Sequence, residues 1–175
     1  MNLAFGVFHV QSLAAAYQLA NSVNHFPGTK LLELIPAHSG AYCLAEGPIS
    51  QLEALLRDQR TSDIINADLI PSLDKTVLKA FYSLETANLG QSLYVVESSR
   101  LGALFTVAQA AVEIGMGILE FRAPRAGQIS GVLTLTQVKN ESEARIEVWL
   151  RKIRAMSALR AEKIEPIQAS LAELF

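Results

Sequence analysis

The chain of 175 residues is poor in the features that mark several common classes of protein. Its single cysteine, Cys43, cannot form an internal disulfide, and one cysteine with three scattered histidines gives no recognisable metal-ligand pattern. Fifteen Lys and Arg against seventeen Asp and Glu leave no basic excess to neutralise a phosphate backbone, so nucleic-acid binding is not expected. Phosphate-cradling loops, Gly-x-Ser-x-Gly motifs and dinucleotide fingerprints are missing as well. We therefore expect no metal, no cofactor and no enzymatic activity.

Long apolar runs are also missing. No window reaches the roughly 18 consecutive apolar residues of a membrane span. The N-terminal stretch is apolar, but it lacks a basic region and is interrupted by His9 and Gln11, so it does not predict a signal peptide. The expected location is the cytoplasm. Half of the residues are nevertheless apolar, and the mean hydropathy is +0.26, which indicates that the chain buries surface against other copies of itself.

The first part of the chain predicts the order strand, helix, strand, strand, helix. Ser12 is a suitable N-cap for the first helix, Pro27-Gly28 ends that helix, and Pro48 suits the first position of the second. The expected strands are AFGVFHV (4–10), LLELI (31–35) and AYCLAEG (41–47), with PAHSG (36–40) as a turn, and the helices cover 12–23 and 48–56.

The same order returns in the second half, which indicates an internal repeat. Leu13 corresponds to Leu101, with an offset of 88 residues. Gly40 corresponds to Gly127 and the triplet 32–34 to 119–121, both with an offset of 87. The expected strands are 92–99, 118–122 and 128–136, with APRAG (123–127) as a turn, and the helices cover 100–115 and 141–156.

The repeat predicts an α+β fold of two tandem, ferredoxin-like βαββα modules. Each module is expected to hold a mostly antiparallel sheet of about four strands, covered on one face by two helices. The first module covers 1–57 and the second 91–156. Residues 58–90 are expected to form a linker with a short helix in LDKTVLKAFYSLE, and residues 157–175 a helical tail broken near Pro166.

Residues 4–56 resemble the shell domain of bacterial microcompartments. The resemblance rests on FGVFHVQS, the alanine-rich LAAAYQLANSV, LLELI, the Pro36–Gly40 turn, AYCLA and Glu46-Gly47-Pro48. In the second copy the matching segments are VVESS, ALFTVAQAAVEIG, ILEFR and the Ala123–Gly127 turn. The resemblance covers about two-thirds of the chain. It rests on the order of the elements rather than on a catalytic signature.

The resemblance implies a non-enzymatic, self-assembling shell protein with tandem domains. Three chains would form a homotrimeric, pseudohexameric ring, and its partners would be other copies and other shell proteins, in the cytoplasm or within a microcompartment. In the family the equivalent turns surround an axial pore. The candidate pore-lining residues are His38, Ser39, Gly40, Arg125, Ala126 and Gly127.

Two other functions stay open. A duplicated ferredoxin-like unit also suits a regulatory module that binds a small molecule between its copies, as in amino-acid-binding regulatory domains. A weaker hypothesis is an enzyme that uses His38 together with a neighbouring chain.

Several other residues have a structural interpretation that outweighs a functional one. His9 is expected on a solvent or interface face of its strand, and Cys43 as a small buried hydrophobe, since no acid or histidine adjoins it. Repeat symmetry explains the matching carboxylates of Glu33 and Glu120. Arg122 and Arg125 could attract anions around an axis, or could simply be solvated. The basic helix around Trp149 is expected to pack through that side chain.

Overall fold

The structure is a computed structural model that describes residues 3–58, 63–90, 92–137, 143–165 and 167. The chain divides into two compact units, one formed by Met1–Leu73 with Arg125–Ile129 and the other by Asp74–Pro124 with Ser130–Phe175. Each unit contains one four-stranded antiparallel sheet. The expected α+β fold of two tandem modules is therefore confirmed.

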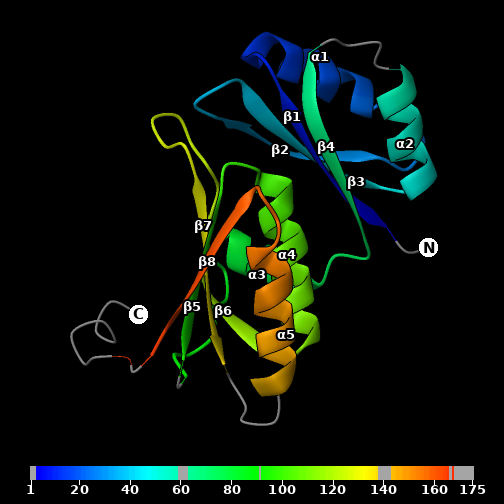
Figure 1. Ribbon diagram of the computed structural model, residues 1–175. Coiled ribbons are helices and arrows are strands. Elements are labelled where there is room, and N and C mark those ends of the chain that lie inside the picture. The colour runs from blue at the N-terminus through cyan, green and yellow to red at the C-terminus, as the bar shows by residue number, and fades with distance from the viewer. Residues whose placement is uncertain (1–2, 59–62, 91, 138–142, 166, 168–175) are drawn as a thin grey trace. The chain divides into compact units, whose positions relative to one another are not determined.

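The first sheet has the strand order β2-β3-β1-β4 (Figure 1). The Ser12 side chain accepts a hydrogen bond from the Ala15 N–H, which confirms the predicted N-cap. The elements are β1 (Ala4–Val10), α1 (Leu13–Val23), β2 (Lys30–Pro36), β3 (Ala41–Gly47), α2 (Ile49–Asp58) and β4 (Ile64–Pro71).

Apolar side chains from both helices and from the sheet form the core of this unit. Every residue of β1 is buried, as expected for the central part of a sheet. Small residues on α1 allow it to lie close to the strands, since a larger side chain there would have to displace its neighbours. The most deeply buried members of this core are Phe8, Ala16, Val23, Ala41, Cys43, Ala45, Leu52 and Leu55.

The second sheet has the order β6-β7-β5-β8, so its topology repeats that of the first. The helices α4 and α5 pack on this sheet and against each other. The elements are α3 (Lys75–Phe81), β5 (Leu93–Ser98), α4 (Leu101–Glu113), β6 (Met116–Arg122), β7 (Gly131–Gln137), α5 (Glu143–Arg154) and β8 (Leu159–Ile164).

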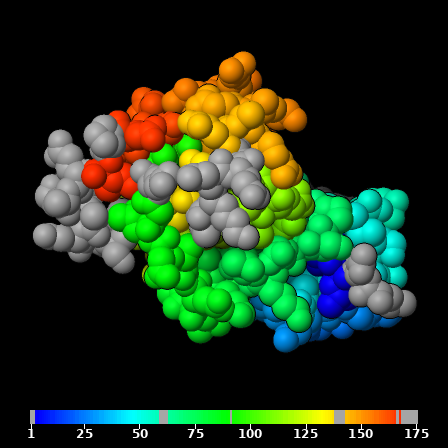
Figure 2. Space-filling view, turned by 90° about the horizontal axis from the view of Figure 1, so that it is seen from below, coloured from blue at the N-terminus to red at the C-terminus, as the bar shows by residue number. Residues whose placement is uncertain are grey.

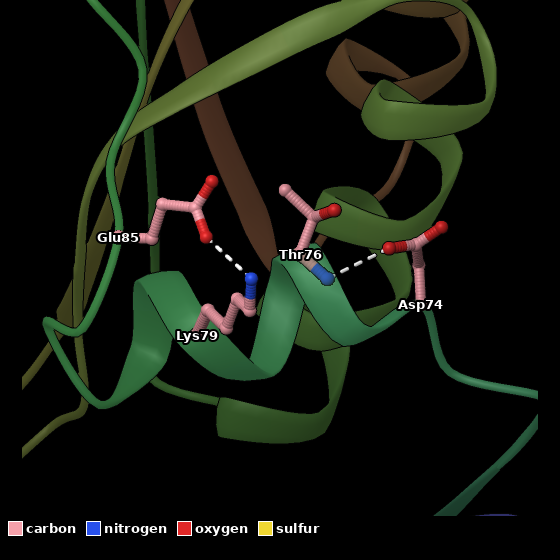
Figure 3. A network of polar contacts seen from close by, with 4 residues as sticks. All are labelled: Asp74, Thr76, Lys79 and Glu85. Carbon is pink, nitrogen blue, oxygen red and sulfur yellow. Dashed lines mark hydrogen bonds and ion pairs between the residues drawn. The ribbon is translucent and has the colours of Figure 1, made fainter.

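The short helix α3 is fixed at both ends. The Asp74 carboxylate accepts a hydrogen bond from the Thr76 N–H at its start, and Lys79 forms an ion pair with Glu85 beyond its end (Figure 3). Its last residue, Phe81, contacts the rings of Phe105 and Phe121, with centroids 4.8 and 5.1 Å away. These three rings anchor α3 to α4 and β6.

The two sheets also share an irregularity. The pairing of β2 with β3 shifts between Leu31 and Glu33, and that of β6 with β7 shifts between Ile118 and Glu120. Both shifts fall at the same position of the repeat, because the offset between the corresponding residues is 87. Such bulges bend a strand and increase its twist, so the two sheets bend at equivalent places.

Two secondary-structure expectations are wrong. The stretch taken as a linker contains β4, which pairs along β1, in addition to the expected short helix. The tail expected to be helical forms β8 over Leu159–Ile164, where it pairs with β5. Both are edge strands that expose one side of their backbone, so their sequences carry polar and charged residues. The expected break near Pro166, and the tail from residue 168 onward, lie outside the described residues.

None of the helices in the described part of the chain is both long and apolar enough to cross a membrane.

Candidate functional site

The first candidate turn joins β2 to β3. Pro36 pairs with Ala41, and the Ala37 N–H donates to the Gly40 carbonyl at 3.1 Å, so the turn closes tightly. The side chains of His38 and Ser39 are exposed at its tip. The structure thus brings the three predicted residues of this turn together at one end of the first sheet.

Gly40 is required in this turn for two separate reasons. Its φ of +92° lies in the left-handed region, which side chains rarely adopt. A Cβ at this position would also lie 1.8 Å from the carbonyl oxygen of Val10 on the neighbouring β1. The turn therefore lies directly against the end of β1, and only glycine permits this approach.

The side chain of His9, on β1, forms a hydrogen bond with the backbone of the same turn. Its Nε2 lies 2.8 Å from the Ser39 carbonyl oxygen, which can only accept, so Nε2 carries the proton and donates. The Asn66 amide lies 3.4 Å from Nδ1, and the imidazole stacks on the Tyr42 ring at 4.5 Å between centroids. His9 is 8% exposed, so the expectation that it faces solvent is wrong.

His9 was not among the residues predicted for the candidate site from the sequence. A histidine inside the apolar run AFGVFHV was the available signal, because a buried imidazole needs partners for its ring nitrogens. The partners come from a turn thirty residues away and from β4, which the sequence did not predict.

The second candidate turn lies between β6 and β7. The Gln128 N–H donates to the Arg125 carbonyl at 2.8 Å, and Gly127 has a φ of +86°. Arg125, Ala126 and Gly127 are all exposed. A Cβ on Gly127 would meet nothing within 4 Å, so this glycine is needed for its backbone conformation alone.

The two arginines of this region differ in their surroundings. Arg122 forms an ion pair with Glu120, with Nε 2.9 Å from Oε1. Within the described residues no carboxylate pairs with Arg125. Both arginines are exposed, and Arg125 is the one whose charge no carboxylate of the described residues neutralises.

The remaining singled-out residues do not form a second site. Cys43 is buried beneath α1 and α2, and burial raises the pKa of its thiol to about 12, so it stays protonated and unreactive near neutral pH. Glu33 and Glu120 lie in different sheets. Trp149 is 6% exposed and packs edge to face on Tyr94, which confirms that its helix is anchored through this side chain.

No cluster of three metal-ligating side chains is present among the residues described above.

Comparison with known proteins agrees with the fold. The architecture defines a class, α+β proteins built from two tandem four-stranded modules. A solved structure of a microcompartment protein from Desulfitobacterium hafniense superposes on this chain with a TM-score of 0.80, covers 99% of both chains and is 19% identical. The resemblance to microcompartment proteins that the sequence suggested is thus confirmed at the level of fold.

Other comparisons add little. No family model and no curated protein matches the sequence. A glycine cleavage system transcriptional repressor has a TM-score of 0.33 at 10% identity over 93% of this chain and 95% of its own. A value this low carries no argument for the regulatory alternative.

Proposed function

We propose that the chain is a self-assembling structural protein of the microcompartment shell type. Three copies form a pseudohexameric ring in which the β2–β3 and β6–β7 turns alternate around the axis. The observation that supports this proposal is the match along the whole chain, since both modules and the segments between them superpose on one microcompartment protein. A likeness of one module alone would not support a ring of three chains.

The geometry of the turns suits residues that surround an opening. Both turns end in a glycine with positive φ, and both expose small or polar side chains at their tips. The close approach of Gly40 to β1 and the hydrogen bond from His9 both hold the first turn against the sheet. A turn held in this way would present the same backbone groups to an opening in every copy of the chain.

The charge of the turns suggests what such a pore would admit. Each chain would contribute Arg125, which has no carboxylate partner in the described part of the chain, beside the neutral Ser39 and Ala126. Three arginines around one axis attract anions and repel small cations. We infer that the opening favours small anionic metabolites.

The other parts of the proposal follow from the same assignment. The partners are further copies of this chain and other shell proteins, and the location is the cytoplasm or a compartment within it. We infer a non-enzymatic role because the residues with catalytic potential are dispersed. The Cys43 thiol is held neutral, and the carboxylates of Glu33 and Glu120 belong to separate sheets.

Cross-linking between engineered cysteines tests the proposed axis. The variant carries Ser39→Cys and Ala126→Cys, both at exposed positions, and the native Cys43 is buried and does not compete. A short bismaleimide should join these positions between neighbouring chains. A ladder that ends at three chains on a denaturing gel is expected.

A matched control carries the two new cysteines on exposed helix positions, Glu53→Cys and Arg151→Cys. This control should give few cross-linked chains at the same protein concentration. Equal ladders from both variants, or cross-links confined within single chains, would contradict the proposed placement of the turns.

A further inference from the structure

A groove of about 520 Å³ lies between α4 and α5 of the second unit. Figure 2 shows α5, in orange, at the surface. Alanines on both walls, Ala110 of α4 and Ala144 of α5, contribute to the open space, because a methyl group extends little beyond the backbone. The volume falls within the range of about 300–1,000 Å³ that is typical of sites for small ligands.

The lining of this groove is mostly apolar. Ile114 closes it on the α4 side, and Val148 and Trp149 on the α5 side. Val148 is 52% exposed, so it presents apolar surface that a ligand can remove from water. The ring of Trp149 is 6% exposed, so it forms part of the apolar wall rather than projecting into solvent.

Cations mark one wall of the groove. Arg145 and Lys152 are exposed residues of α5, two helical turns or about 10 Å apart, with Val148 between them. In the described parts of the chain neither pairs with a carboxylate. On the opposite wall, Glu113 accepts a hydrogen bond from Gln109 at 2.8 Å, which holds this carboxylate against its own helix.

We propose that this groove binds a small amphiphilic anion, such as a medium-chain carboxylate. The anionic head lies at Arg145 or Lys152, and the apolar body covers Ile114 and Val148. Charge complementarity selects this class, because a cationic amphiphile with the same apolar body would meet two cations along α5. The site lies within one unit and does not require the ring.

Trp149 provides the test, because it is the only tryptophan of the chain and lines the groove. The full-length protein is titrated with sodium decanoate, and separately with decyltrimethylammonium of the same chain length, while indole emission is followed. Decanoate should change the emission in a saturable way, with an affinity at least tenfold higher than that of the cation. Equal affinities, or no saturable change with decanoate, would overturn the proposal.

Two variants separate charge recognition from general hydrophobic adsorption. The double variant Arg145→Glu with Lys152→Glu should weaken decanoate binding at least tenfold, and both residues are exposed, so folding should be kept. Arg151→Glu is the matched control, because Arg151 is an exposed residue of the same helix that does not line the groove. This variant should bind decanoate with the affinity of the wild type. Equal losses in both variants would also count against the site. If the chain binds decanoate but is monomeric, the groove proposal stands and the proposed ring is wrong.

Discussion

The imidazole of His9 in β1 donates a 2.8 Å hydrogen bond to the carbonyl of Ser39, at the tip of the turn between β2 and β3. Replacing His9 with alanine removes this bond and the stacking on Tyr42, and leaves a carbonyl without its donor. We expect His9→Ala to lower the free energy of unfolding by about 2 kcal/mol in urea denaturation. His25→Ala, at an exposed site, should change it by less than about 0.5 kcal/mol. Equal effects would show that the contact does not stabilise the turn.

The two turn glycines should respond differently to alanine. Gly127→Ala should lower the free energy of unfolding by about 1–2 kcal/mol, because alanine is strained at a positive φ but its Cβ meets no neighbour. Gly40→Ala adds a Cβ that would lie 1.8 Å from the Val10 oxygen, so β1 or the turn must shift, and a loss above about 4 kcal/mol is expected. Chemical denaturation of both variants measures the difference, and similar losses would contradict the close approach of this turn to β1.

Cys43 should make stability depend on alkaline pH. Burial raises the pKa of its thiol from 9.0 to about 12 in the folded protein. Above pH 9 the unfolded chain loses this proton while the folded chain keeps it, so unfolding becomes more favourable as pH rises. The contribution of this thiol to the free energy of unfolding should fall by up to about 1.4 kcal/mol per pH unit between pH 9 and 10.

The Cys43→Ala variant provides the control for this pH dependence. Tyr94 also has a raised pKa through burial, but its unfolded form ionises mainly above pH 10, so it contributes little in this window. The slope of the stability curve between pH 9 and 10 should therefore be shallower in Cys43→Ala than in the wild type. An unchanged slope would mean that the thiol is accessible in the folded state.

Phe81 should control the attachment of α3. Its ring contacts Phe105 and Phe121, and truncation leaves a gap between them. We expect Phe81→Ala to cost about 3 kcal/mol and to reduce hydrogen-exchange protection over α3 first. Leu84→Ala, at a side chain that is 76% exposed just beyond α3, should leave that protection nearly unchanged. Uniform loss of protection across both units would instead indicate that α3 is not a separate opening element.

The sequence predicted the central strands and the edge strands β2 and β6, but it missed the edge strands β4 and β8. The strand expected over residues 4–10 was found with the same bounds, because β1 is buried throughout and gives a continuous apolar run. β8 has the sequence LRAEKI, in which only Ala161 is buried, and its charges resemble those of a solvent-facing helix. An edge strand pairs on one side only, so it tolerates charges as in β8, whereas the edge strand β2, with the sequence KLLELIP, keeps an apolar run that the sequence reveals.

The contact of Asn66 with His9 beneath the candidate turn could not be predicted, because it depends on the missed strand β4. Asn66 lies on β4, which pairs along His9 at the edge of the first sheet. Without β4, nothing in the sequence connected His9 to the turn at Ser39. The turn residues themselves were found because glycine at the end of each turn is a local requirement, visible in both copies of the repeat.

The solution mass tests the central claim most directly. Size-exclusion chromatography with light scattering, at two protein concentrations, measures it for the wild type. Three chains of 19.0 kDa give about 57 kDa, and this mass or a whole multiple of it is the expected result at both concentrations. A single species of one or two chains at both concentrations would contradict a ring of three.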